Sequence, residues 1–245
     1  TCDMKDAGKE YQRLINDYLV GNSNIMCCGG FHALSSGELG QYLHKLEPFE
    51  APDMFAVEDD TLVMIEHFEF DASRKTQKGM QGKKEESLLL EKIRQRPLDC
   101  KFCVDKIDYS TSVDNWIHNF EYCFENHYKK IPSYIENLKD KIGSRKVVIG
   151  FLAEHLYSPL LKIDEDIAEV PYLFTKQFLD FFLTKAKVDF VLFGTYYSGK
   201  KQLFYMDHGC TCSKELFIDL KSDTVALSHL SYNEAIVSGG FIEDP

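Results

Sequence analysis

Two carboxylates, Asp53 and Glu66, lie in a stretch that predicts a pair of short strands. Residues 54–57 and 61–70 are rich in β-branched and aromatic residues, and three acids that favour a turn separate them. In such a hairpin Asp53 starts the first strand and Glu66 lies in the middle of the second, so both can approach one cation. Converging carboxylates suit Mg²⁺, or Mn²⁺ in its place. The spacing therefore predicts a metal site on this hairpin.

Alternation along the second strand divides its side chains between two faces of a sheet. Glu66 shares its face with apolar residues, and a carboxylate there is costly unless a positive or hydrogen-bonding group meets it. We therefore expect Glu66 to have a partner. The Glu66 face holds Leu62, Met64, Glu66, Phe68 and Phe70, and the opposite face holds Val63, Ile65, His67, Glu69 and Asp71.

The hairpin resembles the PD-(D/E)XK nuclease superfamily, whose motif is Pro-Asp, a hairpin, and then Asp/Glu-x-Lys. Here Pro52-Asp53 is followed, after twelve residues, by Glu66-His67-Phe68. Phe68 stands where the family has its lysine, so the motif is degenerate. The resemblance implies a restriction-endonuclease-like fold and Mg²⁺-dependent hydrolysis of DNA phosphodiester bonds.

The resemblance also implies roles for individual residues. Asp53 and Glu66 would hold the metal, and the backbone carbonyl of His67 would be a further ligand. In the family, the helix before the hairpin often adds an acid to the site. Glu10, in a helix expected over residues 5–20, is the candidate, although a solvent-facing side chain is the simpler interpretation of Glu10.

The absent lysine has candidate substitutes in the segment after the hairpin, since superfamily members are known to supply it from a neighbouring element. Lys78 is preferred because a flexible loop can fold back over the hairpin end, whereas Lys75 lies close to the strand. A lysine ammonium is a compact charge that can stabilise a hydroxide or the transition state. His67 ranks behind both, since alternation points it away from Glu66. Solvated lysines without a role are the alternative.

Composition describes an ordinary globular chain, with 245 residues, 44% hydrophobic and 27% charged. We expect one domain over residues 1–245. No apolar run is long enough for a membrane span and no signal peptide is visible, which predicts a protein without a membrane partner. The chain carries eight cysteines and shows no secretory feature. Reduced thiols and a cytoplasmic location are therefore expected.

The net charge of −11 opposes whole-surface affinity for nucleic acid, but the charge is unevenly distributed. Residues 73–96 hold eight Lys/Arg and three Glu, and residues 128–146 hold six Lys/Arg and two acids. These two basic islands suit a localised groove for DNA phosphates, although solvated helix faces also explain such islands.

Two alternatives come from other functional classes. One is a catalytically inactive relative that kept the nuclease fold as a binding or scaffold protein. The other is a structural zinc protein in which Cys100, Cys103, Cys210 and Cys212 form one site. Small buried side chains are the simpler interpretation of these cysteines.

The order of elements predicts an α/β fold with a central mixed β-sheet of about five strands flanked by helices, in the restriction-endonuclease-like arrangement. Apolar runs at residues 145–156 and 188–196 predict strands buried on both faces, and residues 202–206 predict an antiparallel return. Helical periodicity predicts helices at residues 36–46, 83–95, 115–141 with a kink at Pro132, and 171–186. A short strand is expected at residues 216–220.

Overall fold

The fold is that of a computed structural model, which describes residues 26–28, 36–70, 106–155, 160–163, 166–169, 172–197, 200–209, 217–220 and 225–231. The helices expected over residues 5–20 and 83–95 lie outside these ranges. All five predicted core strands do lie within them.

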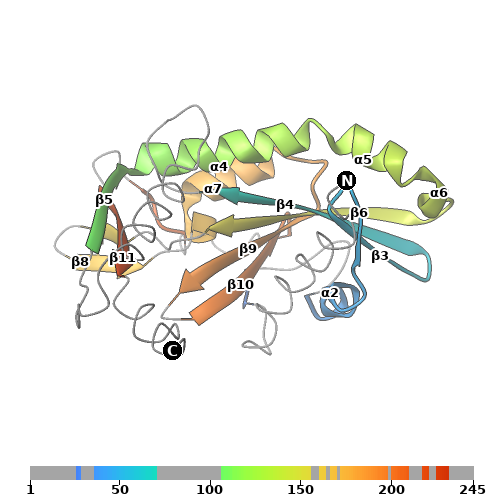
Figure 1. Cartoon of the computed structure of the whole chain (residues 1–245), viewed down its shortest axis with the longest axis horizontal. Helices are drawn as coiled ribbons and strands as arrows, with labels where there is room; N and C mark the ends of the chain where they lie inside the picture. The colour runs from blue at the N-terminus through green and yellow to red at the C-terminus, as the bar shows by residue number, and fades with distance from the viewer. Residues whose placement is uncertain are drawn as a thin grey trace, which may run out of the picture.

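A seven-stranded mixed sheet forms the centre of the molecule, in the order β1-β10-β9-β6-β4-β3-β2 (Figure 1). Strands β4, β6 and β9 run parallel, whereas β2, β3 and β10 are each antiparallel to a neighbour. The α/β prediction is confirmed, and two short edge strands add to the five expected. The bounds are β1 Met26–Cys28, β2 Glu47–Pro48, β3 Met54–Glu58, β4 Thr61–Phe70, β6 Lys146–His155, β9 Phe190–Tyr197 and β10 Lys200–Asp207.

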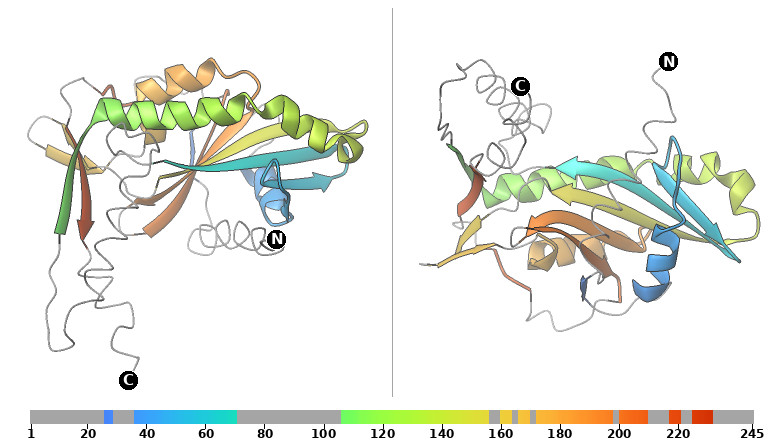
Figure 2. Two further views of the ribbon diagram at one scale, coloured as in Figure 1. Left: turned by 45° about the horizontal axis from the view of Figure 1, so that its top comes forward. Right: turned by 60° about the horizontal axis from the view of Figure 1, so that its bottom comes forward.

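Helices cover both faces of this sheet (Figures 1 and 2). On one face lie α4 (Val113–Tyr128), α5 (Ile131–Asn137), α6 (Lys139–Ile142) and α7 (Lys176–Leu183), and on the other lies α2 (Ser36–Leu43). The predicted kink at Pro132 is confirmed, because the proline lies in the first turn of α5 and separates it from α4. The helix expected over residues 171–186 is shorter, since a 3₁₀ turn at Tyr172–Phe174 precedes Thr175, whose side chain caps α7.

Each face of the sheet packs its own core, and the division follows the alternation predicted for β4. Leu62, Met64 and Phe68 pack with α4, α5 and α7, whereas Val63 and Ile65 pack with α2. The helix side is rich in aromatic rings, which bury large apolar areas. Its fully buried rings include Trp116, Phe120, Phe124, Phe151, Phe178, Phe182 and Phe193.

The predicted hairpin is present and lies in the same sheet as the two buried strands. Glu58 pairs with Thr61, and between them Asp59 has φ 50°, a left-handed conformation that Asp tolerates in turns. In the described part of the chain, α4, α5 and α6 lie between β4 and the parallel strand β6, which is next to β4 in the sheet. This arrangement places the helices directly above the middle of the hairpin (Figure 2).

A second sheet of four strands, in the order β5-β11-β7-β8, lies at one end of the molecule (Figure 1). Its strands are β5 Lys106–Ser112, β7 Leu160–Ile163, β8 Asp166–Glu169 and β11 Val225–Ser231. This sheet was not predicted, because its strands mix polar and apolar residues without a clear period. The strand expected at residues 216–220 is wrong for the described residues 217–220, which form only an isolated bridge between Ile218 and Thr175. The single-domain assignment stays a prediction.

Across the described part of the chain, none of the helices combines the length and apolar character needed to cross a lipid bilayer.

Candidate active site

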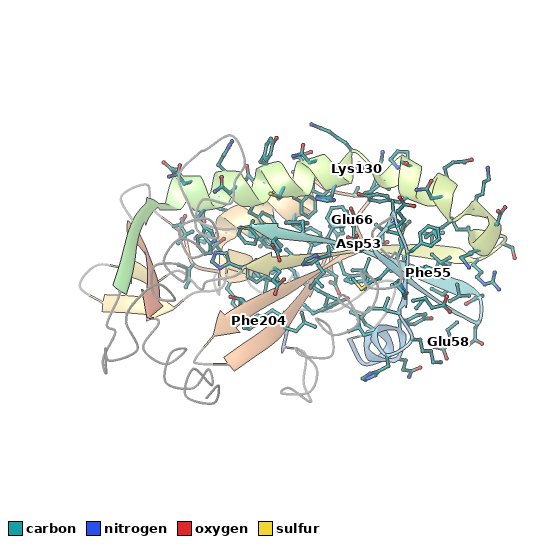
Figure 3. The ribbon with its side chains drawn as sticks, in the orientation of Figure 1. Asp53, Phe55, Glu58, Glu66, Lys130 and Phe204 are labelled. Atoms are coloured by element: carbon teal, nitrogen blue, oxygen red, sulfur yellow. The ribbon has the colours of Figure 1, made fainter. Side chains whose placement is uncertain are left out.

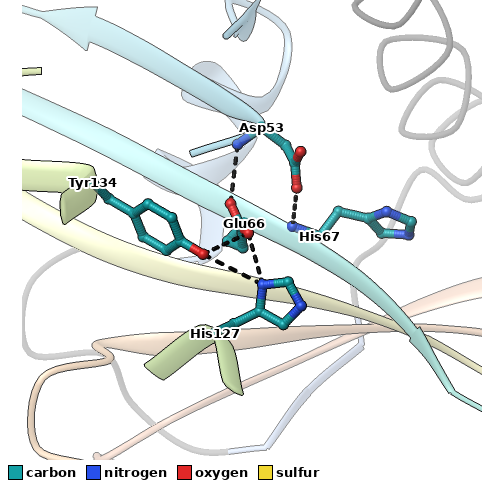
Figure 4. A network of polar contacts seen from close by, with 5 residues as sticks. All are labelled: Asp53, Glu66, His67, His127 and Tyr134. Carbon is teal, nitrogen blue, oxygen red and sulfur yellow. Dashed lines mark hydrogen bonds and ion pairs between the residues drawn. The ribbon is translucent and has the colours of Figure 1, made fainter. Parts of the chain in front are cut away.

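The hairpin brings Asp53 and Glu66 into direct contact. The backbone N–H of Asp53 donates to Oε2 of Glu66 at 3.2 Å, and the backbone N–H of His67 donates to Oδ2 of Asp53 at 2.8 Å. These reciprocal contacts follow from the register, in which Met54 pairs with Ile65. Figures 3 and 4 show Asp53, just before β3, close to Glu66 on β4.

The start of the hairpin is fixed by two further hydrogen bonds. Phe49 N–H donates to the carbonyl oxygen of Asp53 at 2.8 Å, which closes the connection into β3. The Asn137 side chain, on α5, donates from Nδ2 to the Ala51 carbonyl at 2.9 Å. Helix α5 therefore holds the connection that carries Asp53 into β3 and, through Tyr134, the side chain of Glu66.

Glu66 is 7% exposed and is satisfied by two side chains from the helices above it. The phenol of Tyr134 donates to Oε1 at 2.6 Å, and Nδ1 of His127 lies 2.7 Å from the same oxygen (Figure 4). Glu66 therefore has the partners that its buried position predicts, the phenol of Tyr134 and the imidazole of His127. Burial, and then the hydrogen bond to Glu66, raise the pKa of Tyr134 well above its usual range, so the phenol keeps its proton.

His127 lies over Phe68, the residue at the position where the PD-(D/E)XK motif has lysine. Its ring stacks on Phe68, with ring centroids 5.5 Å apart and an interplanar angle of 16°. Phe68 is 5% exposed and packs among the aromatic rings of the core, so it cannot supply a charge. His127 instead carries the only imidazole that contacts Glu66 within the described residues.

The carboxylate oxygens of Asp53 and Glu66 are ligands that suit a hard cation. A carboxylate offers about four lone-pair positions. The described contacts of Glu66 use two on Oε1 and one on Oε2, the oxygen that faces the Asp53 backbone. A lone pair on Oε2 therefore remains, and Asp53 and Glu66 both carry the oxygen ligands that Mg²⁺ favours.

The side chain of His67 points away from Glu66, as alternation predicted (Figure 4). Its Nε2 lies 3.3 Å from Oε2 of Glu154 on β6. The role of the His67 carbonyl as a metal ligand stays a prediction.

Several other predicted residues lie outside the described part of the chain. They are the acid of the predicted first helix, the two candidate lysines and the four cysteines of the zinc alternative: Glu10, Lys75, Lys78, Cys100, Cys103, Cys210 and Cys212. The structure neither supports nor opposes their predicted roles.

Sequence reasoning placed Tyr134 and His127 in the helical region at residues 115–141 and gave neither a role in the site. A signal was nevertheless present, because the two residues are seven apart, about two helical turns, and so fall on one face of the helical region. The predicted need of Glu66 for a partner, combined with these polar groups on an otherwise apolar stripe, would have indicated the contact.

Exposed positive charge flanks the site at the junction of α4 and α5. Lys129 and Lys130 are both exposed and lie between His127 and Tyr134 in the chain. Figure 3 shows Lys130 on the outer side of the helix layer, above Glu66. Part of the second predicted basic island therefore lies on the outer side of the helix layer that covers Glu66.

Comparison of the chain with protein-family models, with curated proteins and with solved structures returned no match. The likeness to the PD-(D/E)XK nucleases thus depends on the Pro52-Asp53 and Glu66 positions and on the order of the strands.

Proposed function

We propose that this protein is a Mg²⁺-dependent nuclease that hydrolyses phosphodiester bonds in DNA. The observation that carries the proposal is the pair of contacts at the start of the hairpin, in which the Asp53 N–H donates to Glu66 and the His67 N–H donates to Asp53, so that the two acids occupy neighbouring positions. A helix, a hairpin, a crossover helix and a parallel strand surround this position, an order that supports the same interpretation.

In the proposed site, Asp53 and Glu66 bind Mg²⁺, or Mn²⁺ in its place. When bound, such an ion polarises a phosphate oxygen and lowers the pKa of a coordinated water. Tyr134 keeps Glu66 in one orientation through its hydrogen bond to Oε1. The His67 N–H fixes the Asp53 carboxylate in the same way.

His127 is the described residue best suited to handle the proton that the attacking water loses. If Nδ1 donates to Glu66, the imidazole presents an unprotonated Nε2 that can accept a proton. A carboxylate that orients an imidazole is an arrangement suited to general-base catalysis. Lys75 and Lys78 remain proposed substitutes for the family lysine and compete with His127 for this role.

The proposed substrate contacts begin at Lys129 and Lys130, whose exposed ammonium groups can neutralise phosphates beside the site. Eight cysteines in a chain of this size favour a reducing compartment, so the proposal also includes a cytoplasmic location.

A second candidate function is a nuclease-fold scaffold or binding protein without catalysis. The observation that favours it is the set of donors on Glu66, because Tyr134, His127 and the Asp53 backbone already satisfy three of its lone-pair positions. Such a carboxylate is stable in its buried position without a metal.

Nicking of supercoiled plasmid in Mg²⁺ or Mn²⁺ tests the two candidates. Under the nuclease proposal the wild type nicks DNA and is inhibited by a chelator, and Asp53→Asn and Glu66→Gln lose at least about 100-fold in rate, the scale of a lost electrostatic contribution. The conservative control is Glu47→Gln, an exposed acid on the same sheet. The variants His127→Gln, Lys75→Met and Lys78→Met identify which residue acts in place of the family lysine.

Nicking that survives Asp53→Asn would reject the assigned site. A folded wild type that binds DNA and never nicks it would favour the scaffold candidate.

A further inference from the structure

We propose that His67, Glu69 and Glu154 bind a divalent transition-metal ion of the Zn²⁺ type on the face of the sheet opposite Glu66. Each of these residues offers a ligand atom, and the three atoms lie within 4.8 Å of one another. Nε2 of His67 and Oε2 of Glu154 are 3.3 Å apart. This site uses the His67 side chain, whereas the proposed nuclease site uses only the His67 backbone, and the proposal does not depend on the nuclease site.

The fold brings these three residues together in a defined way. His67 and Glu69 are two positions apart on β4, so their side chains project from the same face. In the parallel register of β4 and β6, Glu69 is the direct partner of Glu154. All three residues lie near the carboxyl ends of parallel strands, the edge at which open α/β sheets bind their ligands.

A cation bound between these residues would reduce the repulsion between their carboxylates. Like charges on directly paired residues of adjacent strands destabilise a sheet. Glu154 is 7% exposed, so water screens its carboxylate weakly. On its other flank Glu154 pairs with Gly194, which contributes no side chain. A divalent cation between two carboxylates and a neutral imidazole would make the cluster neutral overall.

The distances and ligand types favour a transition metal over Mg²⁺. Bonds of about 2.0–2.1 Å in a tetrahedral zinc site separate neighbouring ligand atoms by roughly 3.3 Å. The His67–Glu154 distance of 3.3 Å already has this value. Glu69 is only half-buried, so a change of rotamer can bring its carboxylate to the same point. Imidazole nitrogen suits zinc and similar ions, whereas Mg²⁺ prefers oxygen alone.

Three protein ligands leave one position of a tetrahedral ion open. Zinc sites with three protein ligands and an open position bind water or a substrate, whereas structural sites are closed by a fourth protein ligand. We therefore place this ion in the class that can bind an exchangeable ligand.

Zinc titration of the full chain by calorimetry, after removal of metal with a chelator, tests the proposal. The wild type should bind one more equivalent of Zn²⁺ than Glu69→Gln and His67→Gln do, or these variants should bind that equivalent at least about 100-fold more weakly. A loss of this size exceeds the usual effect on metal affinity of removing a group that only contacts a ligand. Cysteine-bound zinc would be common to all variants and cancels from the difference. Glu66→Gln removes the proposed nuclease site, and Glu47→Gln is an exposed control, so both should retain this equivalent.

Anomalous diffraction at the zinc absorption edge locates the ion directly, and a peak between the three side chains is the expected result. Glu154→Gln is a third variant. If this substitution at the more buried position prevents folding, Glu69→Gln still tests the proposal. Unchanged zinc binding in both Glu69→Gln and His67→Gln, or an anomalous peak only elsewhere, would overturn the proposal. Absence of DNA nicking by the wild type would bear on the nuclease proposal alone.

Discussion

The phenol of Tyr134 donates a hydrogen bond of 2.6 Å to the carboxylate of Glu66 across the interface between α5 and β4. Tyr134 is 3% exposed, and the same carboxylate oxygen lies 2.7 Å from His127. Two helix residues therefore fix a strand residue that is otherwise surrounded by apolar side chains. Removal of the Tyr134–Glu66 hydrogen bond should therefore lower the free energy of unfolding.

Tyr134→Phe should lower the free energy of unfolding by about 1.5–3 kcal/mol, the range for a hydrogen bond to a charged group. The substitution keeps the ring and removes only the donor. Chemical denaturation at neutral pH measures the change. Tyr122→Phe is the matched control because Tyr122 is 61% exposed, and it should change the free energy by less than about 0.5 kcal/mol. Equal effects of the two substitutions would contradict a stabilising role for the Tyr134–Glu66 bond.

Substitution of Lys129 and Lys130 by Ala should weaken binding of duplex DNA and reduce its dependence on salt. Each phosphate contact that is lost lowers the slope of log K against log salt by about 0.9. Fluorescence anisotropy at several salt concentrations measures both quantities. Lys45→Ala is the control, because Lys45 follows α2 on the opposite face and forms an ion pair with Glu58. An unchanged slope in the double variant, or an equal change in the control, would exclude this surface from DNA binding.

Gly150→Ala should destabilise the protein by about 1–3 kcal/mol, the usual cost of overpacking a core. A Cβ at Gly150 would lie 2.1 Å from the ring of Phe190, which pairs with Gly150 across β6 and β9. The buried ring has little room to move. Thermal and urea denaturation measure the effect.

Gly40→Ala is a matched control with the opposite expected sign. Nothing lies within 4 Å of a Cβ at Gly40, which is in α2. Replacing a helical glycine by alanine there should stabilise by about 0.5–1 kcal/mol. A neutral Gly150→Ala would mean that Phe190 can leave its place over β6.

Much of the fold could be predicted because its central strands carry strong signals. Period-two alternation identified both faces of β4, and continuous apolar runs identified β6 and β9. The short strands β1 and β2 have two or three residues, too few for any period. The second sheet was missed because its polar strands resemble connecting segments.

The candidate site was predicted only in part, because register and helix rotation are tertiary properties. Asp53 and Glu66 belong to one hairpin, so their spacing in the sequence was enough to predict that they lie close together. The contact of His127 with Glu66 depends on how α4 lies over β4. The pairing of Glu69 with Glu154 likewise depends on the register between two strands that are far apart in the chain. Local patterns do not determine either arrangement.

His155, at the end of β6, should make stability depend on pH. It is 2% exposed and packs against Phe70, with ring centroids 4.8 Å apart, and against Trp116 and Phe193. Neither ring nitrogen has a hydrogen-bond partner among the described residues. Burial lowers the pKa of His155 from 6.5 to about 3. The folded protein therefore holds this imidazole neutral at pH values where the unfolded chain protonates it.

The sign of the effect follows from proton binding. Between pH 6.5 and about 3 the unfolded chain binds one more proton at this residue than the folded protein does, so stability is present above pH 6.5 and is lost as the pH falls. The slope reaches about 1.4 kcal/mol per pH unit. His155→Phe replaces the imidazole with an apolar ring of similar shape, and it should remove this slope while leaving stability at pH 7 unchanged or higher.

Urea denaturation of wild type and His155→Phe at pH 7, 6, 5 and 4, with a chelator present, measures the difference between their slopes. Other titrating groups are common to both proteins and cancel. His44→Phe is the control, since His44 is exposed at the end of α2 and should leave the slope as in the wild type. If His155→Phe loses stability with falling pH as steeply as the wild type does, then His155 is protonated in the folded protein. Water would then have to reach the His155 imidazole between Phe70, Trp116 and Phe193.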